Sequence, residues 1–154
     1  MNNTLQKFYT AFQNLEPEKM VESYHSEIEF EDPAFGKLSG AKAKNMWRML
    51  CNSSKELEIM FSDVKCDDEK GSVNWEAKYT FSKTGRKIHN KIRSEFELKD
   101  GKIIKHKDNF SLYKWAIQAF GIKGILLGWT PIFKSKLNKE TNKLLEIYEL
   151  RNRL

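Results

Sequence analysis

The sequence predicts an α+β fold in which helices pack on one face of an antiparallel sheet. Three segments near the N-terminus carry apolar residues at helical spacing, and four later segments alternate apolar with polar residues between short turns. Helices and strands do not alternate along the chain, which excludes the βαβ units of a parallel sheet. We therefore expect a layer of helices over a meander of strands.

One hydrophobic core accounts for the length and composition. The chain has 154 residues, of which 40% are hydrophobic and 31% are charged, as in a folded globular domain. A domain of about 150 residues buries roughly 70% of its unfolded surface, which is enough for a single core. We assign residues 1–118 to the α+β domain, and residues 119–154 to an apolar segment and a C-terminal helix packed on it.

The N-terminal helices are predicted from apolar spacing and from one proline. Leu5, Phe8 and Phe12 recur at helical intervals, which places them on one buried stripe of an amphipathic helix. Pro17 suits the first turn of a second helix, because proline lacks an N–H that would have no partner there. A third helix is expected over about residues 41–51.

A change of period to two residues marks the strands. Ile28, Phe30 and Asp32 share one side of the first strand, which we expect to end in a loop at Pro33 and Gly36. Polar turns separate the later strands. The residues that share a face in those strands are Leu57, Ile59 and Phe61; Trp75, Ala77, Tyr79 and Phe81; Ile88, Asn90, Ile92, Ser94 and Phe96; and Ile104, His106, Asp108, Phe110 and Leu112.

Four polar residues, Asp32, Asn90, His106 and Asp108, occupy positions where the alternation calls for apolar ones. A buried carboxylate without partners costs several kcal/mol, so it must be paired, protonated or placed in a wet cavity. If the four converge on one pocket, Asp32 or Asp108 can serve as a general base with a pKa raised by burial, and His106 can orient a neighbour or shuttle a proton. In the alternative, each marks a strand end that meets solvent, and Asp32 caps the loop at Pro33.

Five side chains, with Asn90 again among them, are candidates for binding a substrate in such a pocket. Four of them are aromatic, and aromatic residues at these periodic positions are more often ordinary core than pocket lining. Both roles stay open for the aromatic residues. The candidates are Tyr9, Trp47, Trp75, Tyr79 and Asn90.

Composition and motifs exclude several classes of function. The net charge of +6 comes from 27 Lys and Arg against 21 Asp and Glu, and half of the excess lies in residues 134–154, so we expect no nucleic-acid groove. Cys51 and Cys66 fit neither a metal site nor a disulfide framework. The chain carries no phosphate-binding or dinucleotide fingerprint, so neither a metal nor an organic cofactor is expected. Without a signal peptide or a membrane span, the cytoplasm is the expected location.

Several short motifs, together with the order of elements, resemble the SnoaL-like branch of the nuclear transport factor 2-like superfamily over nearly the whole chain. The resemblance implies a cystatin-like cone in which a strongly curved antiparallel sheet wraps around helices and leaves an apolar pocket at its open end. It also implies a homodimer formed through the outer sheet face. The motifs are Tyr24-His25, Phe30-Glu-Asp-Pro-Ala-Phe-Gly36, Met46-Trp-Arg-Met-Leu-Cys51, Tyr79-Thr-Phe-Ser-Lys-Thr-Gly85 and Gln118-Ala-Phe-Gly121.

The resemblance also suggests roles for individual residues. In the related ketosteroid isomerases the residue that matches Asp32 is the general base, and Tyr9 lies near a tyrosine that binds the enolate oxygen. Ser94 stands near the second donor of the isomerases, which is an aspartic acid there. In the polyketide cyclases an aspartate occupies the position of Ser111, and the Asp-Arg-Asp set of limonene epoxide hydrolases is not recognisable. The resemblance therefore implies the fold, while the reaction depends on this chain's own residues.

We expect an enzyme of isomerase, cyclase or hydrolase type that uses carboxylate acid–base chemistry on a small hydrophobic molecule. A non-catalytic protein that binds a hydrophobic ligand in the same pocket is the first alternative. A protein-interaction module that uses the apolar residues 120–133 is the second. That segment is too short and too rich in glycine to span a membrane. We expect it to cover the pocket mouth or a dimer interface, with docking on an anionic membrane surface as a third use.

Overall fold

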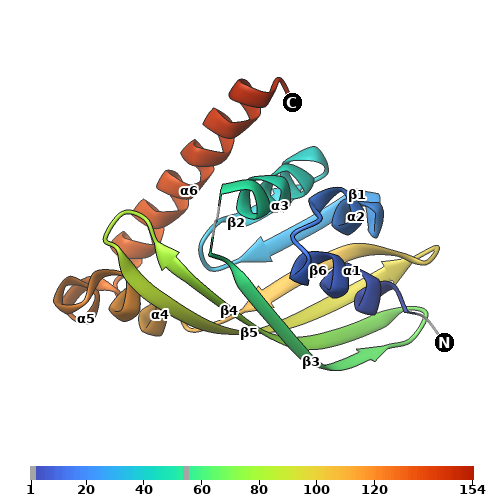
Figure 1. Ribbon diagram of the computed structural model, residues 1–154, viewed down its shortest axis with the longest axis horizontal. Helices are drawn as coiled ribbons and strands as arrows, with labels where there is room; N and C mark the ends of the chain where they lie inside the picture. Colours follow the sequence, from blue (N-terminus) through green and yellow to red (C-terminus); the bar gives the residue numbers. More distant parts are fainter. Residues whose placement is uncertain (1–2, 54–55) are drawn as a thin grey trace.

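A computed structural model describes residues 3–53 and 56–154 of the chain. Helices α1 to α3 lie over one face of a curved sheet, and α4 and α5 lie together at one end of the molecule (Figure 1). This arrangement confirms the predicted α+β class. In chain order the elements are α1 (Thr4–Gln13), α2 (Pro17–Glu22), β1 (Tyr24–Asp32), β2 (Gly36–Ser39), α3 (Ala41–Ser53), β3 (Glu58–Cys66), β4 (Lys70–Phe81), β5 (Arg86–Lys99), β6 (Lys102–Asn109), α4 (Leu112–Phe120), α5 (Ile122–Leu127) and α6 (Pro131–Asn152).

The sheet contains one parallel pair, where we expected only antiparallel ones. Its strand order is β2-β1-β6-β5-β4-β3, and β1 pairs with β6 in parallel. The segment from β3 to β6 forms the predicted antiparallel meander, whose last strand lies beside the first strand of the fold. Alternation within a strand identifies its faces but not its neighbours, which is why the sequence did not predict this pairing.

Strand β2 also differs from the prediction, which placed a loop at its residues. The chain reverses after Asp32 and pairs back on β1, so that Phe30 faces Leu38 and Asp32 faces Gly36. Gly36 has a φ of 74°, which glycine adopts without steric cost. With four residues and one buried apolar side chain, Leu38, the strand is too short for its period to be recognised.

Strand β6 ends earlier than predicted, and at its start Ile103 and not Ile104 faces inward, whereas His106 and Asp108 face inward as predicted. Ile103 is fully buried and Ile104 only partly, because a bulge beside Leu98 shifts the pairing of β5 with β6. Leu112 was expected on the inner face of this strand, but it begins α4. Ser111 caps α4, since its side-chain oxygen accepts a hydrogen bond from the backbone N–H of Lys114 at 3.2 Å.

The core lies between the inner face of the sheet and the first three helices. Leu5, Phe8 and Phe12 of α1 are buried as predicted, and Trp47 of α3 packs edge-on against Phe8, Phe12 and Phe30. The outward face of β5 carries mainly charged side chains, among them Glu97, which forms an ion pair with Lys105 at 3.2 Å. The helices therefore cover the inner face, whereas the outer face is polar.

Helix α6 crosses the molecule beside α3 and the β1–β2 turn (Figure 1). It is exposed along most of its length, and its one fully buried side chain is Leu145, which joins the main core. Near its C-terminal end, Tyr148 accepts a hydrogen bond from Asn52 at 3.0 Å, and Glu149 pairs with Lys42 at 3.5 Å. No helix in the described ranges is long and apolar enough to cross a membrane.

Adjacent leucines of α6 provide a test of this packing. Leu145 is 0% exposed and Leu144 is 57% exposed. Leu145→Ala is expected to lower the free energy of unfolding by about 2–5 kcal/mol, because it leaves a cavity between α6 and the core. Leu144→Ala, the matched control, is expected to change it by less than about 0.5 kcal/mol. Urea denaturation followed by circular dichroism measures both; equal effects would contradict the packing of α6.

Candidate active site

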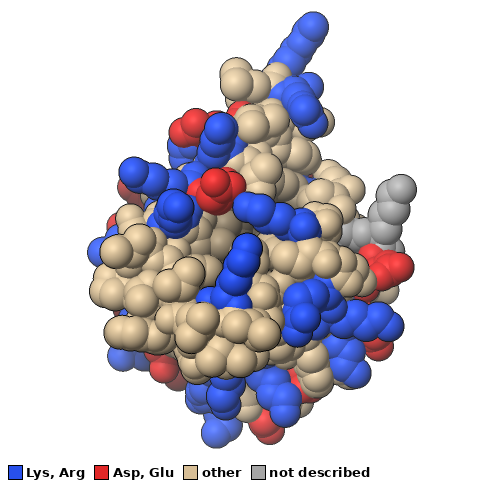
Figure 2. Space-filling model, turned by 90° about the vertical axis from the view of Figure 1, so that its left-hand side faces the viewer, with Lys and Arg blue, Asp and Glu red and all other residues tan. Residues whose placement is uncertain are grey.

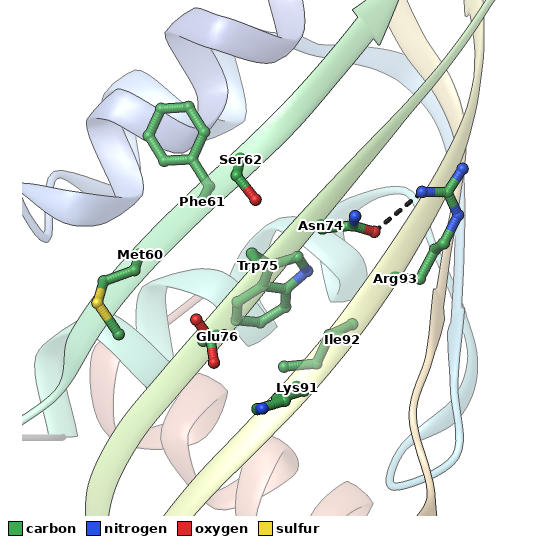
Figure 3. A pocket seen from close by; sticks show the side chains of 9 residues that line it. All are labelled: Met60, Phe61, Ser62, Asn74, Trp75, Glu76, Lys91, Ile92 and Arg93. Carbon is green, nitrogen blue, oxygen red and sulfur yellow. Dashed lines mark hydrogen bonds between the residues drawn. The ribbon is translucent and has the colours of Figure 1, made fainter.

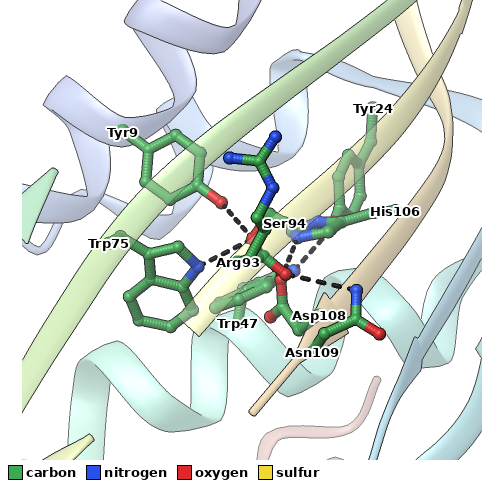
Figure 4. A network of polar contacts seen from close by, with 9 residues as sticks. All are labelled: Tyr9, Tyr24, Trp47, Trp75, Arg93, Ser94, His106, Asp108 and Asn109. Carbon is green, nitrogen blue, oxygen red and sulfur yellow. Dashed lines mark hydrogen bonds and ion pairs between the residues drawn. The ribbon is translucent and has the colours of Figure 1, made fainter. Parts of the chain in front are cut away.

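A network of buried polar groups on the inner face of the sheet centres on Asp108 of β6 (Figure 4). His106 Nε2 lies 2.7 Å from Asp108 Oδ1, and His106 Nδ1 lies 2.7 Å from the hydroxyl of Tyr24. Ser94 of β5 donates its hydroxyl to the same oxygen of Asp108. The network thus joins β1, β5 and β6 and confirms that the inward-phase His106 and Asp108 lie together.

Three aromatic side chains from the surrounding elements supply further hydrogen bonds. The indole N–H of Trp47 donates to Tyr24 at 2.7 Å. Ser94 Oγ accepts from the indole N–H of Trp75 at 2.7 Å and from the hydroxyl of Tyr9 at 2.9 Å. Every buried side-chain nitrogen and oxygen in the described part of the chain has a partner, so this polar cluster leaves no such atom unpaired.

Donor directions in the network follow from the tryptophans. An indole N–H only donates, so the oxygens of Tyr24 and Ser94 accept from Trp47 and Trp75 and can pass their own protons onward. The hydroxyl of Tyr24 can then donate to Nδ1 of His106, whose Nε2 faces Asp108. Both chains of donors end on one oxygen of Asp108, which is the arrangement that stabilises a carboxylate.

The two tyrosines of the network remain protonated donors. Burial raises the pKa of Tyr9 and Tyr24 well above the ordinary value, and the charge of Asp108 raises both further. The ring of His106 stacks on Trp47, with centroids 5.6 Å apart, and its side chain is fully buried. His106 therefore contacts Asp108 and Tyr24 from inside the core.

Asp32, the last residue of β1, lies next to Asp108. The parallel register pairs Glu31 with Lys107, so the next residues on the two strands, Asp32 and Asp108, are neighbours on the inner face. Asp32 is half-buried, and burial raises the pKa of its carboxyl from 3.8 to about 7. The backbone N–H of Phe35, which donates to Asp32 Oδ1 at 2.6 Å, lowers that pKa, and the charge of Asp108 raises it.

The turn that follows Asp32 is held by α6. The side-chain amide of Asn138 donates to the backbone oxygens of Pro33 and Ala34, both at 2.9 Å. Thr141 also donates to Ala34, and Asn142 donates to Phe35, each at 2.9 Å. All three carbonyl groups of the turn are thereby bonded to one helix, which fixes the backbone next to the Asp32 carboxyl.

A second pair of inward polar groups lies at the same end of the sheet as Asp32. Tyr79, near the end of β4, accepts a hydrogen bond from the indole N–H of Trp115 in α4 at 2.8 Å. Burial raises the pKa of Tyr79, and the charge of Asp32 adds to that increase, so the two groups interact. Asn90 of β5 lies opposite Ala77 and is half-buried, and its amide bonds to none of the described residues.

The predicted site residues thus separate into two groups. Tyr9, Trp47 and Trp75 are buried among the core aromatics and hydrogen bonded to the network, so they support it from behind. Asp32, Tyr79 and Asn90 are half-buried at the end of the sheet where β1 and β4 end. The latter group, with Asp108 behind it, is the candidate active site.

Two surface hollows lie away from this site. One of about 560 Å³ follows α1 and α2, and one of about 450 Å³ crosses β3 to β5 on the face turned away from the helices (Figure 3). Both polar and apolar residues line the second, and among them Arg93 donates to Asn74 at 2.9 Å. It belongs to the face where a homodimer was predicted, and that dimer stays a prediction.

Metal binding has no support in the described parts of the chain. They contain no group of three or more His, Cys, Asp or Glu side chains that could hold an ion. Cys51 is buried beside Met20, and burial raises the pKa of its thiol to about 11. A thiol with so high a pKa is a poor nucleophile at neutral pH.

Comparison with protein families identifies the domain. The sequence profile of the SnoaL-like domain matches residues 5–106, about two thirds of the chain. The chain belongs to the SnoaL-like family. Comparison with curated proteins returns no significant match. In this SnoaL-like protein the matched region ends at His106, so Asp108 and helices α4 to α6 lie beyond it.

Solved structures support the cone-shaped fold of the SnoaL-like protein. A protein from Catenulispora acidiphila with a ketosteroid isomerase-like fold, in complex with trimethylamine, is 12% identical with a TM-score of 0.66, covering 83% of this chain and 97% of that one. A putative polyketide cyclase from Xanthomonas campestris is 16% identical with a TM-score of 0.63, covering 76% and 94%. TerC co-crystallised with polyporic acid is 16% identical with a TM-score of 0.59, covering 70% and 88%.

Sequence reasoning missed the residues that α4 and α6 contribute. Trp115 holds the hydroxyl of Tyr79, and Asn138, Thr141 and Asn142 hold the turn after Asp32. The last three are spaced by three and four residues, which places them on one face of a helix. Uncharged polar residues at that spacing, in a helix otherwise rich in charge, were the available signal.

Removing the hydroxyl of Ser94 tests the network. Ser94→Ala leaves the hydroxyl of Tyr9 and the indole N–H of Trp75 without an acceptor, and each loss is expected to cost about 1–3 kcal/mol of unfolding free energy. Ser72→Ala, on the outward side of the neighbouring strand, is the control and should have little effect. Denaturation of both variants measures the difference, and a stable Ser94→Ala protein would contradict the network.

The pKa of Asp32 gives a prediction about pH. Below about pH 4 its carboxyl is protonated in both the folded and unfolded states, so it does not affect stability. Between about 4 and 7 unfolding releases a proton, so rising pH weakens the fold by up to about 1.4 kcal/mol per unit. Asp32→Asn should remove this decline.

Two measurements check the raised pKa of Asp32. NMR titration of the carboxyl carbons should show one signal with a midpoint near 7 that is missing in Asp32→Asn. Denaturation across the same pH range should show wild type losing stability relative to the variant as pH rises. A midpoint for Asp32 near the ordinary ~3.9 would refute the raised pKa.

Proposed function

We propose that this SnoaL-like protein is an enzyme that moves a proton on a small hydrophobic carbonyl compound, with Asp32 as the general base. The observation that carries the proposal is the half-buried Asp32 carboxyl, whose pKa of about 7 lies near ambient pH, at the open end of the sheet. A base works best when its pKa lies close to the working pH, because enough of it is ionised and it still binds a proton well. Isomerase and cyclase reactions can both begin with this proton transfer.

The proposed first step breaks a C–H bond next to the substrate carbonyl. The proton passes to the Asp32 carboxylate, and the electron pair of the bond moves to the carbonyl oxygen as an enolate. Returning the proton to another carbon gives an isomerase, whereas attack of the enolate carbon on a second carbonyl gives a cyclase. Both outcomes need the base and a site that stabilises the enolate oxygen.

Tyr79 and Asn90 are the proposed donors to that oxygen. The Tyr79 oxygen accepts from Trp115, which leaves its own proton free to donate to a substrate. Its raised pKa keeps that proton in place near neutral pH. The Asn90 amide, unbonded among the described side chains, supplies a second N–H from the adjacent strand.

Asp108 and His106 have a positioning role in this proposal. The negative charge of Asp108 contributes to the raised pKa of Asp32, and the two donor chains hold the Asp108 carboxyl in place. His106 orients Asp108 from the core and does not meet the substrate. Among the structural neighbours, the putative polyketide cyclase and TerC with polyporic acid support a small organic ligand for this fold.

Deuterium exchange tests the proposal without knowledge of the natural substrate. A panel of bicyclic and tricyclic ketones is incubated with the protein in heavy water, and loss of the α-proton signal is followed by NMR. For a ketone that binds, the exchange rate is expected to rise with pH through about 7. Asp32→Asn should lower that rate by about 10²–10⁴-fold while the ketone still binds.

Glu29→Gln is the matched control, because Glu29 belongs to the same strand but is exposed on the opposite face. It should leave exchange unchanged. Tyr79→Phe should retain binding and slow exchange. If ketones bind and raise the melting temperature without any exchange, the protein is a carrier of hydrophobic ligands, which is the alternative function for the same site.

A further inference from the structure

Large apolar side chains of α5 and its flanks face solvent. Helix α5 lies beyond the end of the sheet (Figure 1), and the exposed apolar side chains of α5 and its flanks are called here the apolar patch. Monomeric proteins seldom leave so many neighbouring large apolar residues uncovered without a binding role. The members, with their exposed fractions, are Ile122 (76%), Ile125 (48%), Leu126 (64%), Leu127 (55%), Trp129 (69%) and Ile132 (75%).

Close packing of α5 on α4 keeps these side chains outside. A Cβ atom added to Gly124 would lie 2.1 Å from the backbone oxygen of Ala116, and one added to Gly128 would lie 2.6 Å from the Ala116 Cβ. No side chain fits on this inner side of α5. The helix therefore buries its glycines and presents isoleucine and leucine outward, the reverse of an ordinary surface helix.

The backbone carbonyl groups at the C-terminal end of α5 accept hydrogen bonds from side chains. Helix ends normally leave carbonyl groups that bind water. Here Tyr113 donates to the backbone oxygen of Ile125 at 2.9 Å, Trp129 to that of Leu126 at 3.0 Å, and Thr130 to that of Leu127 at 2.6 Å. Three consecutive carbonyls are satisfied by side chains, as insertion into hydrocarbon requires.

The charge around the apolar patch has one sign. Residues 109–139 contain five lysines and neither aspartate nor glutamate. Figure 2 faces this end of the molecule and shows a broad uncharged surface with blue Lys and Arg side chains around it and few red ones. Lys123 lies within the patch sequence, and Lys134 and Lys136 follow it on α6.

We propose that the apolar patch docks on an anionic membrane surface, with its isoleucine, leucine and tryptophan side chains at the acyl boundary and its lysines at the lipid head groups. Apolar contact and attraction to anionic lipid act together in this mode of binding. A second copy of the chain fits less well, because a two-fold interface would bring the lysines around one patch against those of the other, and like charges repel. A protein partner would need hydrogen-bonding groups, and those at the end of α5 are already satisfied internally.

Co-sedimentation with lipid vesicles tests the proposal on the full chain. We expect binding to vesicles of equal parts phosphatidylglycerol and phosphatidylcholine, weak binding to phosphatidylcholine alone, and loss of binding as salt is raised. Trp129 is the exposed tryptophan, since Trp47, Trp75 and Trp115 are buried. Its fluorescence should shift to the blue on binding, and Trp129→Phe should abolish that shift.

Three double substitutions test the apolar patch and the lysines beside it. Leu126→Gln with Ile132→Gln is expected to weaken vesicle binding at least about tenfold. Leu144→Gln with Leu150→Gln is the control, since both leucines are exposed but lie outside the patch. Lys123→Glu with Lys134→Glu should remove the preference for anionic vesicles. All these positions face solvent, so circular dichroism should show intact folds.

Three results would overturn the proposal. One is no binding to anionic vesicles at low salt. Another is equal loss of binding in the patch and control pairs. The third is a concentration-dependent dimer, seen by light scattering without vesicle binding, that Leu126→Gln with Ile132→Gln dissolves; the patch would then be an interface between copies.

Discussion

The carboxylate of Asp108, buried in the middle of the sheet, is the constraint on which the inner layer depends. A carboxylate at that depth needs hydrogen bonds in place of those it would make with water. Its donors must reach one oxygen through His106 and Ser94, and these in turn are held by tyrosines and tryptophans from α1, α3, β1 and β4. The same aromatic residues therefore do two things: they fill the core of the cone, and their polar atoms hydrogen bond to the network that holds Asp108.

Alternation in the sequence was enough to predict which polar residues face inward, and the structure places Asp32, His106 and Asp108 together. What the pattern could not supply was the neighbour of each strand, because pairing of β1 with β6 joins segments about 75 residues apart. The distinction between supporting and ligand-facing side chains was also out of reach. Tyr9 and Tyr79 have similar periodic signals, yet one is sealed behind Ser94 and the other lies half-buried at the open end.

The family match includes Asp32, Tyr79 and Asn90 but not all of the residues that support them. The profile of the SnoaL-like domain ends at His106, whereas Asp108, Trp115 and the α6 residues that hold the turn after Asp32 lie beyond it. The family match therefore covers most of the curved sheet and the first helices, and the groups that hold the Tyr79 hydroxyl and the turn after Asp32 come from the C-terminal third. Fold resemblance at 12–16% identity is compatible with a different reaction for the same reason, since function depends on the site and not on the scaffold.

The attachment of α6 to the turn after Asp32 has a consequence for the order of folding. Asn142 and Phe35 are 107 residues apart, so this contact closes one of the longest loops in the chain. During synthesis the sheet and first helices can assemble while the C-terminal helix is still inside the ribosome. The backbone beside the Asp32 carboxyl is fixed only when the last helix docks. A chain cut short before α6 would have the sheet and the first helices but would lack the hydrogen bonds that hold the turn after Asp32.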